Sequence, residues 1–299
     1  MCPNCNEAQE IIKRGHYRRL SDHKIIQRFK CKKCLKSFSL QSFSYDFRLR
    51  KRHLNQGVFR LLSKGMSQRG CAEVLGVDPK TIARRITRFG KCAKQQLRLS
   101  QSRVRGVQAV VFDEMESFEH SKLKPLTIAL AVEHKSRRIL ALEVGKIAAK
   151  GHLADISRRK YGKRMCERKK ILEEFFSRLS PMLDPRCHLS SDESQHYPKV
   201  LRKHLGIALH KTYKSRRATI TGQGEMKKGG FDPLFCINQT AAMIRDNVKR
   251  MSRRTWCTTK LIERLVDLLY IYAFYHNQRI DQVRRPRIFN VPLSFAMPI

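Results

Sequence analysis

The sequence predicts a multi-domain chain with three parts: a small cysteine-rich ribbon, an all-α helix-turn-helix unit, and an α/β domain built on a mixed sheet. Three observations predict this architecture. Two Cys-x-x-Cys pairs stand near the amino terminus, segments of helical period with a strong start signal follow, and two apolar segments further on each end in aspartate. At 299 residues the chain is long enough for one sizeable core and one or two small modules.

The first part, residues 1–45, contains two pairs of cysteines that can share one metal ion. The pairs are Cys2 with Cys5 and Cys31 with Cys34. Each pair puts two thiolates on one tight turn, and two pairs complete the tetrahedral site that suits Zn²⁺. Segments 11–17 and 25–30 between them read as the strands of a hairpin. Two such pairs without a βαβ context argue against a redox role, so we expect a zinc ribbon with a structural ion.

The second part, residues 46–94, has the pattern of a helix-turn-helix DNA-binding domain. Asp78 and Pro79 give an N-cap followed by proline at the first helical position. Apolar residues recur along this helix at Ile82, Ile86 and Phe89. The side chains expected on its outer surface are Lys80, Thr81, Arg84, Arg85 and Arg88. This is the layout of a recognition helix for the major groove, and the alternative is a small bundle with a solvated basic face.

Residues 95–106 are polar and basic without a convincing apolar stripe, so we expect a linker or the frayed end of a helix there. The third part, residues 107–299, contains short apolar runs that predict the strands of a mixed sheet. These runs are at 107–115, 126–132, 138–144 and 187–192. The second and third are close enough in sequence to form a hairpin.

Two of the predicted strands end in aspartate, at Asp113 and at Asp192. A carboxylate at the carboxyl end of a buried strand sits on a rigid element, next to a crevice that a ligand can reach. One such residue is weak evidence, because a strand can simply turn polar as it surfaces. Two in one sheet describe a carboxylate pair that can hold divalent metal. Two hard cations about 4 Å apart clamp the attacking and leaving oxygens of an in-line phosphoryl transfer.

The composition favours nucleic acid as a partner. The chain has 63 Lys+Arg against 25 Asp+Glu and a formal net charge of +38. Such a charge destabilises a compact chain unless a polyanion relieves it, and phosphate neutralisation gives strong, salt-sensitive binding. No apolar run approaches the roughly 20 residues that cross a bilayer, and the first residues lack a signal-peptide layout. We therefore expect no membrane partner and a cytoplasmic, nucleoid-associated protein.

The order of these features resembles the DDE-type insertion-sequence transposases, which have a ribonuclease H-like catalytic domain. The resemblance rests on the cysteine pairs, the helix-turn-helix, and the two strands that end in Asp113 and Asp192. It continues in segment 237–256, which is similar to the closing catalytic helix of the family, including its trailing Arg-Arg-Thr. It covers nearly the whole chain, and the ordered combination is more specific than any single motif.

The family places a glutamate, the third metal ligand, near the start of this helix, where the present sequence has Asn238. An asparagine offers one neutral carbonyl oxygen, but it adds no charge and cannot act as a base. Some relatives are similar in carrying Asn at this point. Glu225 is the other candidate, in a glycine-rich segment that reads as a loop, and a third possibility is that neither residue is a ligand.

The resemblance implies a DNA transposase that binds the terminal inverted repeats of its element and moves it by strand cleavage and strand transfer. Its implied cofactors are a structural Zn²⁺ and two catalytic Mg²⁺ or Mn²⁺ ions. Its implied partners are double-stranded DNA, as element ends and as target, and further copies of the chain in a homo-oligomer on DNA. The alternatives are a ribonuclease H-like nuclease without strand transfer and a non-catalytic DNA-binding regulator, domesticated or decayed.

Overall fold

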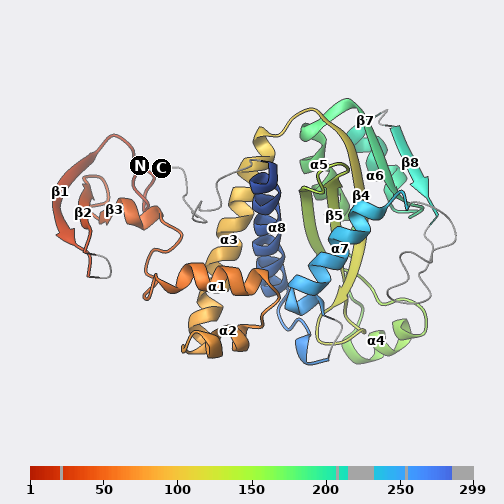
Figure 1. Ribbon diagram of the computed structural model, residues 1–299, viewed down its shortest axis with the longest axis horizontal. Coiled ribbons are helices and arrows are strands. Elements are labelled where there is room, and N and C mark those ends of the chain that lie inside the picture. The colour runs from red at the N-terminus through yellow and green to blue at the C-terminus, as the bar shows by residue number, and fades with distance from the viewer. Residues whose placement is uncertain (21–22, 207–208, 215–231, 253–254, 285–299) are drawn as a thin grey trace.

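The chain forms a three-stranded ribbon, a helical unit and a five-stranded mixed sheet with helices on both faces. The computed structural model describes residues 1–20, 23–206, 209–214, 232–252 and 255–284 (Figure 1). Figure 1 shows the ribbon at one end of the molecule, the sheet at the other, and the helical unit between them.

The ribbon has three antiparallel strands in the order β1-β2-β3. They are β1 (Ile11–Arg18), β2 (Ile25–Cys31) and β3 (Ser37–Ser39), followed by a 3-10 turn, η1 (Leu40–Phe43). The two predicted strands correspond to β1 and β2, while β3 is too short to give a sequence pattern. The Phe29 and Phe38 rings stack at 5.7 Å across β2 and β3. These few apolar contacts make a very small core. We therefore expect the cysteines at the end of the ribbon to contribute much of its stability.

The helical unit contains α1 (Leu54–Ser63), α2 (Gln68–Val74) and the first half of α3 (Pro79–Arg103). Both α2 and α3 begin at capping residues. Ser67 Oγ accepts a hydrogen bond from the Gly70 N–H at 3.0 Å, and Asp78 Oδ1 accepts one from the Lys80 N–H at 2.6 Å. Ile82, Ile86 and Phe89 are buried, as predicted. This core fixes which side of α3 faces outward.

Segment 95–106, predicted as a linker or the frayed end of a helix, is helical as far as Arg103, because α3 continues without a break. The linker assignment is therefore wrong for residues 95–103. The second half of α3 carries Ala93 and Leu97 into the core of the sheet domain, and the final helix α8 (Ile262–Arg284) packs along it. The two helices approach so closely at Gly90 that an added Cβ would lie 2.4 Å from Asp267 Oδ1. Ala93 and Leu97 form too short an apolar stripe to predict a helix from the sequence. The residues of α8 that stabilise this part of α3 lie more than 160 positions further along the chain.

The large sheet has the strand order β6-β5-β4-β7-β8. The strands are β4 (Val107–Phe118), β5 (Pro125–Glu133), β6 (Ile139–Lys146), β7 (Leu183–Asp192) and β8 (Leu209–Tyr213). Strand β5 is antiparallel to both β4 and β6, while β7 runs parallel to β4 and β8 runs parallel to β7. The mixed sheet is thus as predicted, and β4 is its central strand.

Helices cover both faces of this sheet. One face packs against α7 (Phe235–Asn247), α8 and the end of α3, and the other against α5 (Arg168–Leu179) and α6 (Tyr197–Leu205). In Figure 1, α7 crosses in front of β4 and β5. The basic connection after β6 contains a further helix, α4 (Leu153–Tyr161), and short 3-10 turns lie at η2 (Ser180–Met182), η3 (Lys249–Met251) and η4 (Thr255–Cys257).

The helix predicted over 237–256 is shorter in the structure, because α7 ends at Asn247. Val248 and Met251 are buried as expected, but they reach the core from the η3 turn. No helix in the described part of the chain combines the length and apolarity needed to cross a membrane.

Arg85 differs most sharply from its predicted place. It was expected on the outer, DNA-facing surface of α3, but its side chain is only 2% exposed. Its guanidinium donates hydrogen bonds to Asn55 Oδ1 at 3.0 Å and to the carbonyls of Arg50 at 2.6 Å and Lys51 at 2.8 Å. The prediction was wrong because these acceptors lie 30 or more residues away and leave no trace in the helical period of α3.

Replacing Arg85 with Met should destabilise the fold by about 2–4 kcal/mol, because one buried and two partly buried acceptors lose their donor while the volume is roughly kept. Arg84→Met, at the exposed neighbour, should change the unfolding free energy by less than about 0.5 kcal/mol. Urea unfolding followed by circular dichroism measures both. Equal stabilities for the two variants would show that the Arg85 hydrogen bonds contribute nothing to the fold.

Candidate functional site

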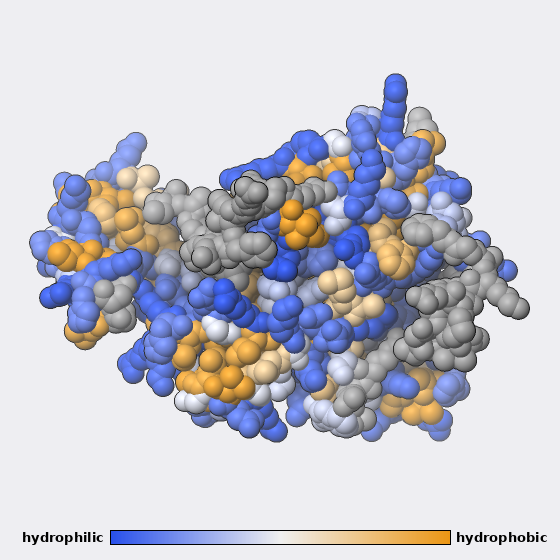
Figure 2. All heavy atoms as spheres, in the orientation of Figure 1, coloured by the Kyte–Doolittle hydropathy of each residue, from blue (hydrophilic) through white to orange (hydrophobic). Residues whose placement is uncertain are grey.

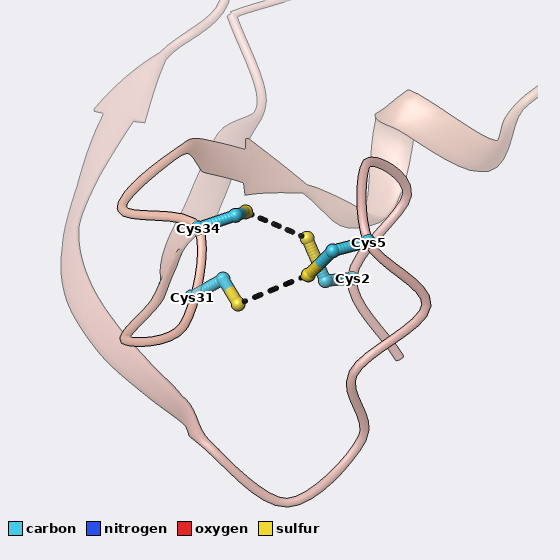
Figure 3. A group of neighbouring side chains, drawn as sticks. All are labelled: Cys2, Cys5, Cys31 and Cys34. Atoms are coloured by element: carbon cyan, nitrogen blue, oxygen red, sulfur yellow. Dashed lines mark hydrogen bonds between the residues drawn. The ribbon is translucent and has the colours of Figure 1, made fainter.

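The four amino-terminal cysteines converge at the end of the ribbon. Cys2 and Cys34 bring their Sγ atoms within 3.6 Å, and so do Cys5 and Cys31 (Figure 3). All four sulfurs lie within 4.8 Å of one another. One pair comes from the turn before β1 and the other from the turn after β2, so strand pairing brings them together. These four predicted residues could therefore hold one zinc ion.

Two thiols of this cluster, those of Cys5 and Cys34, have strongly shifted pKa values. The backbone N–H of Lys36, together with the neighbouring sulfurs, lowers the pKa of Cys34 to about 6. The pKa of Cys5 is raised to about 12: the Glu7 backbone N–H acts against the rise, but burial and the other three sulfurs outweigh it. Four sulfurs this close cannot all ionise without a cation between them. The four sulfur donors are soft ligands, which suit a metal ion such as Zn²⁺.

Asp113 and Asp192 lie on the two parallel central strands. Asp192 is the last residue of β7, as predicted, but Asp113 is not at a strand end, because β4 continues to Phe118 paired with β5. The pairing of β4 with β7 ends at Val111 and Ser190, and each aspartate stands two residues beyond that last shared pair. Asp113 is still paired with β5 and Asp192 with β8. Val111 and Met115 pack under α7 and α8, and Asp113 shares their face by strand alternation. Cys187 and Leu189 face α5 and α6, so Asp192 lies on the α7 side as well.

A cavity of about 250 Å³ opens where β4 and β7 separate. Its lining residues are Asp113, Glu114, Glu116, Lys150, Arg168, Asp192, Ser194, Gln195, His196 and Tyr197. The strand order reverses between β4 and β7, since the chain goes from β4 to β5 and β6 on one side and returns to β7 and β8 on the other. Ligands of open α/β sheets bind at such a reversal, outside the carboxyl ends of the strands.

The two carboxylates influence each other electrostatically. Burial, with a further contribution from the charge of Asp192, raises the pKa of Asp113 from 3.8 to about 6. The Glu114 N–H, which donates to Asp113 Oδ1 at 2.7 Å, and the charge of Arg245 act in the opposite direction. Asp192 Oδ1 accepts a longer hydrogen bond from the Ser194 N–H at 3.3 Å. A cation between the two aspartates would relieve their repulsion.

The neighbouring residue of β4, Glu114, points to the opposite face, as strand alternation predicts. Glu114 Oε1 accepts a hydrogen bond from Thr127 Oγ1 at 2.6 Å and lies 3.1 Å from Arg168 Nε. Arg168 also reaches Glu116 at 3.6 Å and His196 at 2.7 Å. These contacts join α5 to the part of β4 that lies beyond its pairing with β7. Sequence reasoning missed Arg168 because its partners lie on other elements.

Asn238 lies on the exposed flank of α7, outside the lining of the cavity between β4 and β7. Its Nδ2 donates to Asp232 Oδ2 at 2.8 Å, and the other oxygen of Asp232 accepts from the Leu234 N–H at 2.9 Å. Asn238 is seven residues before Arg245, so the two share one side of the helix. Of these two residues, Arg245 is the one whose charge lowers the pKa of Asp113. The other candidate for the third ligand, Glu225, lies outside the described residues.

Among the described residues, the four cysteines are the one set of three or more potential metal ligands within reach of a common ion. Asp113 and Asp192 stand as a pair. Their carboxylate oxygens are the ligand type that hard divalent cations prefer.

The outer face of α3 keeps most of the predicted basic set. Lys80, Arg84 and Arg88 are exposed and Thr81 is half-buried, while Arg85 is withdrawn into the core. Figure 2 shows that hydrophilic residues dominate the visible face of the molecule, with apolar residues gathered over α1 and α2.

No protein-family model matches the sequence, and no curated protein matches it.

The raised pKa of Asp113 predicts a pH-dependent stability. In the unfolded chain the carboxyl ionises near pH 3.8, but in the fold it does so near 6, so the folded state binds the proton more tightly between these values. Stability is therefore lost as pH rises through this window. In the presence of a metal chelator at pH 8, the free energy of unfolding of Asp113→Asn should exceed that of wild type by about 1–3 kcal/mol.

The advantage of Asp113→Asn should shrink towards zero near pH 4, where the wild-type carboxyl is protonated in the fold. Urea unfolding at the two pH values gives the comparison. An advantage that does not change with pH would mean that Asp113 ionises normally in the folded chain.

Proposed function

We propose that this chain is a DNA transposase of the DDE type, whose Asp113 and Asp192 hold catalytic divalent metal. The observation that carries the proposal is the placement of the two carboxylates side by side, where β4 and β7 part and the strand order reverses. Two neighbouring carboxylates in a cavity are unexpected in a chain of net charge +38, and metal-dependent phosphoryl transfer on DNA would explain their placement.

The sheet supports the ribonuclease H-like part of the proposal. Its strands, numbered along the chain from β4, stand in the order 3-2-1-4-5, and the second is antiparallel to the rest. This is the arrangement expected of a ribonuclease H-like domain. The first carboxylate comes from the central strand and the second from the next strand of the parallel side, which agrees with the resemblance drawn from sequence.

Two Mg²⁺ or Mn²⁺ ions, when bound, would stabilise the attacking and leaving oxygens of the reaction. The protein's part is to hold and orient. Asp113 and Asp192 supply the negative charge, the Glu114 N–H fixes one oxygen of Asp113, and the Arg168 contacts keep β4 from shifting. Asn238 is the proposed third, neutral ligand, on the side of α7 that it shares with Arg245; Glu225 remains the alternative.

In the proposed reaction, a water oxygen first attacks a phosphodiester at the element end, and the departing 3′ oxygen takes a proton to leave a free 3′-hydroxyl. That hydroxyl then attacks a target phosphodiester, forming one P–O bond while another breaks. Exposed Lys80, Arg84 and Arg88, with Thr81, would contact the duplex where α3 approaches its major groove. Cutting two element ends together requires at least a dimer bound to DNA. The protein would act in the cytoplasm, where the nucleoid lies.

The test uses a duplex made from the DNA that flanks the reading frame, a target plasmid and Mg²⁺. Asp113→Ala and Asp192→Ala should each lower cleavage and joining by about a hundred-fold or more, because each removes a metal ligand. Asp184→Ala is the matched control, since it removes an acid from the same strand β7 outside the cavity, and it should keep wild-type activity.

The outcomes separate the candidate functions. Cleavage without joined product would favour a nuclease of the same fold. Wild-type transactions by both aspartate variants would contradict the metal mechanism and favour a non-catalytic DNA-binding regulator. Asn238→Ala and Glu225→Ala, compared for metal-dependent cleavage, assign the third ligand: the variant that loses activity names it, and equal full activity excludes both.

We also propose that the cysteine cluster carries a structural Zn²⁺. Purified protein should contain one zinc per chain, and Cys31→Ser should lose it and unfold the ribbon, since such small folds depend on their metal. Cys166→Ser, at an exposed cysteine outside the cluster, should keep the zinc. Elemental analysis gives the zinc content, and wild-type content in Cys31→Ser would contradict the assignment.

A further inference from the structure

A basic hollow lies between segment 48–51 and the first half of α3. Its volume is about 470 Å³, and its lining residues are Arg48, Leu49, Arg50, Lys51, Thr81, Arg84 and Arg85. Segment 48–51 belongs to the connection that runs from the ribbon to α1, as Figure 1 shows. The hollow is remote in sequence and in fold from the Asp113 cavity and shares no residue with it.

All the charged residues that line the hollow are basic. Five of its seven lining residues are Arg or Lys, and none is acidic. Arg48, Arg50, Lys51 and Arg84 are exposed at its surface, and Arg85 is buried behind them. The nearest acid on the connection, Asp46, is engaged with Arg52 at 3.3 Å. So many like charges around one concave surface repel each other unless an anion lies among them.

The backbone of segment 48–51 is held in a costly conformation. Arg48 and Lys51 have φ angles of 63° and 54°, in the left-handed region that side chains with a Cβ rarely adopt. Each such residue costs of order 1 kcal/mol and persists only when its surroundings hold it there. Here the Arg85 guanidinium does so by donating to the carbonyls of Arg50 and Lys51. The buried arginine thus fixes the loop that presents the exposed ones.

The chemistry of the hollow suits a phosphodiester. Guanidinium groups donate planar pairs of hydrogen bonds that match phosphate oxygens, and Thr81 adds a hydroxyl at the same wall. The hollow also adjoins the outward face of α3, because Arg84 belongs to both. A duplex that received α3 in a groove would pass its backbone beside this loop. Backbone contacts of this kind set the register and orientation of a protein on DNA.

We infer that the hollow between segment 48–51 and α3 is a seat for a backbone phosphate of duplex DNA, with Arg85 as the positioning residue of the loop. The inference rests on the DNA binding in the proposed function and extends it. It assigns Arg48, Arg50, Lys51 and Arg84 to sequence-independent backbone contact. It leaves Lys80 and Arg88 as the exposed cations of the predicted set that are free to read base edges.

The experiment measures the salt dependence of binding to a fluorescein-labelled duplex of mixed, unrelated sequence, by anisotropy over about 50–200 mM salt. Replacing Arg50 and Lys51 together with Ala should lower affinity and reduce the slope of log K against log salt by about 1, the value for one lost phosphate contact. Both side chains are exposed, so the variant should fold. Arg60→Ala, an exposed arginine of α1 outside the hollow, should leave affinity and slope as in wild type.

The same loss on the unrelated duplex and on the flanking-DNA duplex supports a backbone contact. A wild-type slope in the double variant, or a loss confined to one sequence, overturns the inference. Calorimetry with inorganic phosphate distinguishes the source of the anion: saturation at micromolar concentration would mean that the hollow binds free phosphate, and it too would overturn the assignment to DNA. If the wild-type chain binds no duplex, the DNA binding of the proposed function is refuted. If the wild-type chain binds duplex and the double variant keeps the wild-type slope, only the phosphate seat in the hollow is refuted.

Discussion

The structure depends on the separation of β4 from β7. These parallel strands pair as far as Val111 and Ser190 and then part, at the point where the strand order reverses. The separation creates the cavity, and strand alternation puts Asp113 and Asp192 on the same side of it. Burial of Asp113 on the rigid strand β4, with a further contribution from the charge of Asp192, raises its pKa. Arg168 contacts Glu114 and Glu116 in the part of β4 that pairs with β5 but no longer with β7.

The long helix α3 connects this site with the basic face. Its first half lies in the core of the helical unit, with Ile82, Ile86 and Phe89, and its second half lies in the core of the sheet, with Ala93 and Leu97. Because α8 packs along it and also contributes to both cores, the helical unit and the sheet are joined by two packed helices. In the proposed function, this joint would fix the distance between the DNA contacts of α3 and the aspartate pair.

Sequence reasoning predicted the features whose signals are local. The cysteine pairs, the capped start of α3, the strands and the strand end at Asp192 are each written within a few consecutive residues, whereas β4 runs past Asp113 because it pairs with β5. It could not predict features that depend on distant partners. Burial of Arg85 requires Asn55 and the carbonyls of the 48–51 segment, and the extension of α3 through the supposed linker requires α8. The short β3 strand and α4 have patterns too brief or too basic to stand out.

The third ligand illustrates the same limit. Segment 237–256 was recognisable by its apolar period, but the side of α7 on which Asn238 lies follows from how the helix packs on the sheet. The structure puts Asn238 against Asp232 and brings the charge of Arg245 near Asp113. Nothing in the spacing of the residues foretells the Asp232 contact, because both partners are polar residues flanking the start of one helix.

The most direct test of the account is a Mn²⁺ titration of the zinc-loaded protein, followed by electron paramagnetic resonance of the free ion. The aspartate pair should bind Mn²⁺, and Asp113→Asn and Asp192→Asn should each abolish that binding while Asp184→Asn retains it. Equal Mn²⁺ binding by wild type and both site variants would contradict the claim that the parting of β4 and β7 builds a metal site.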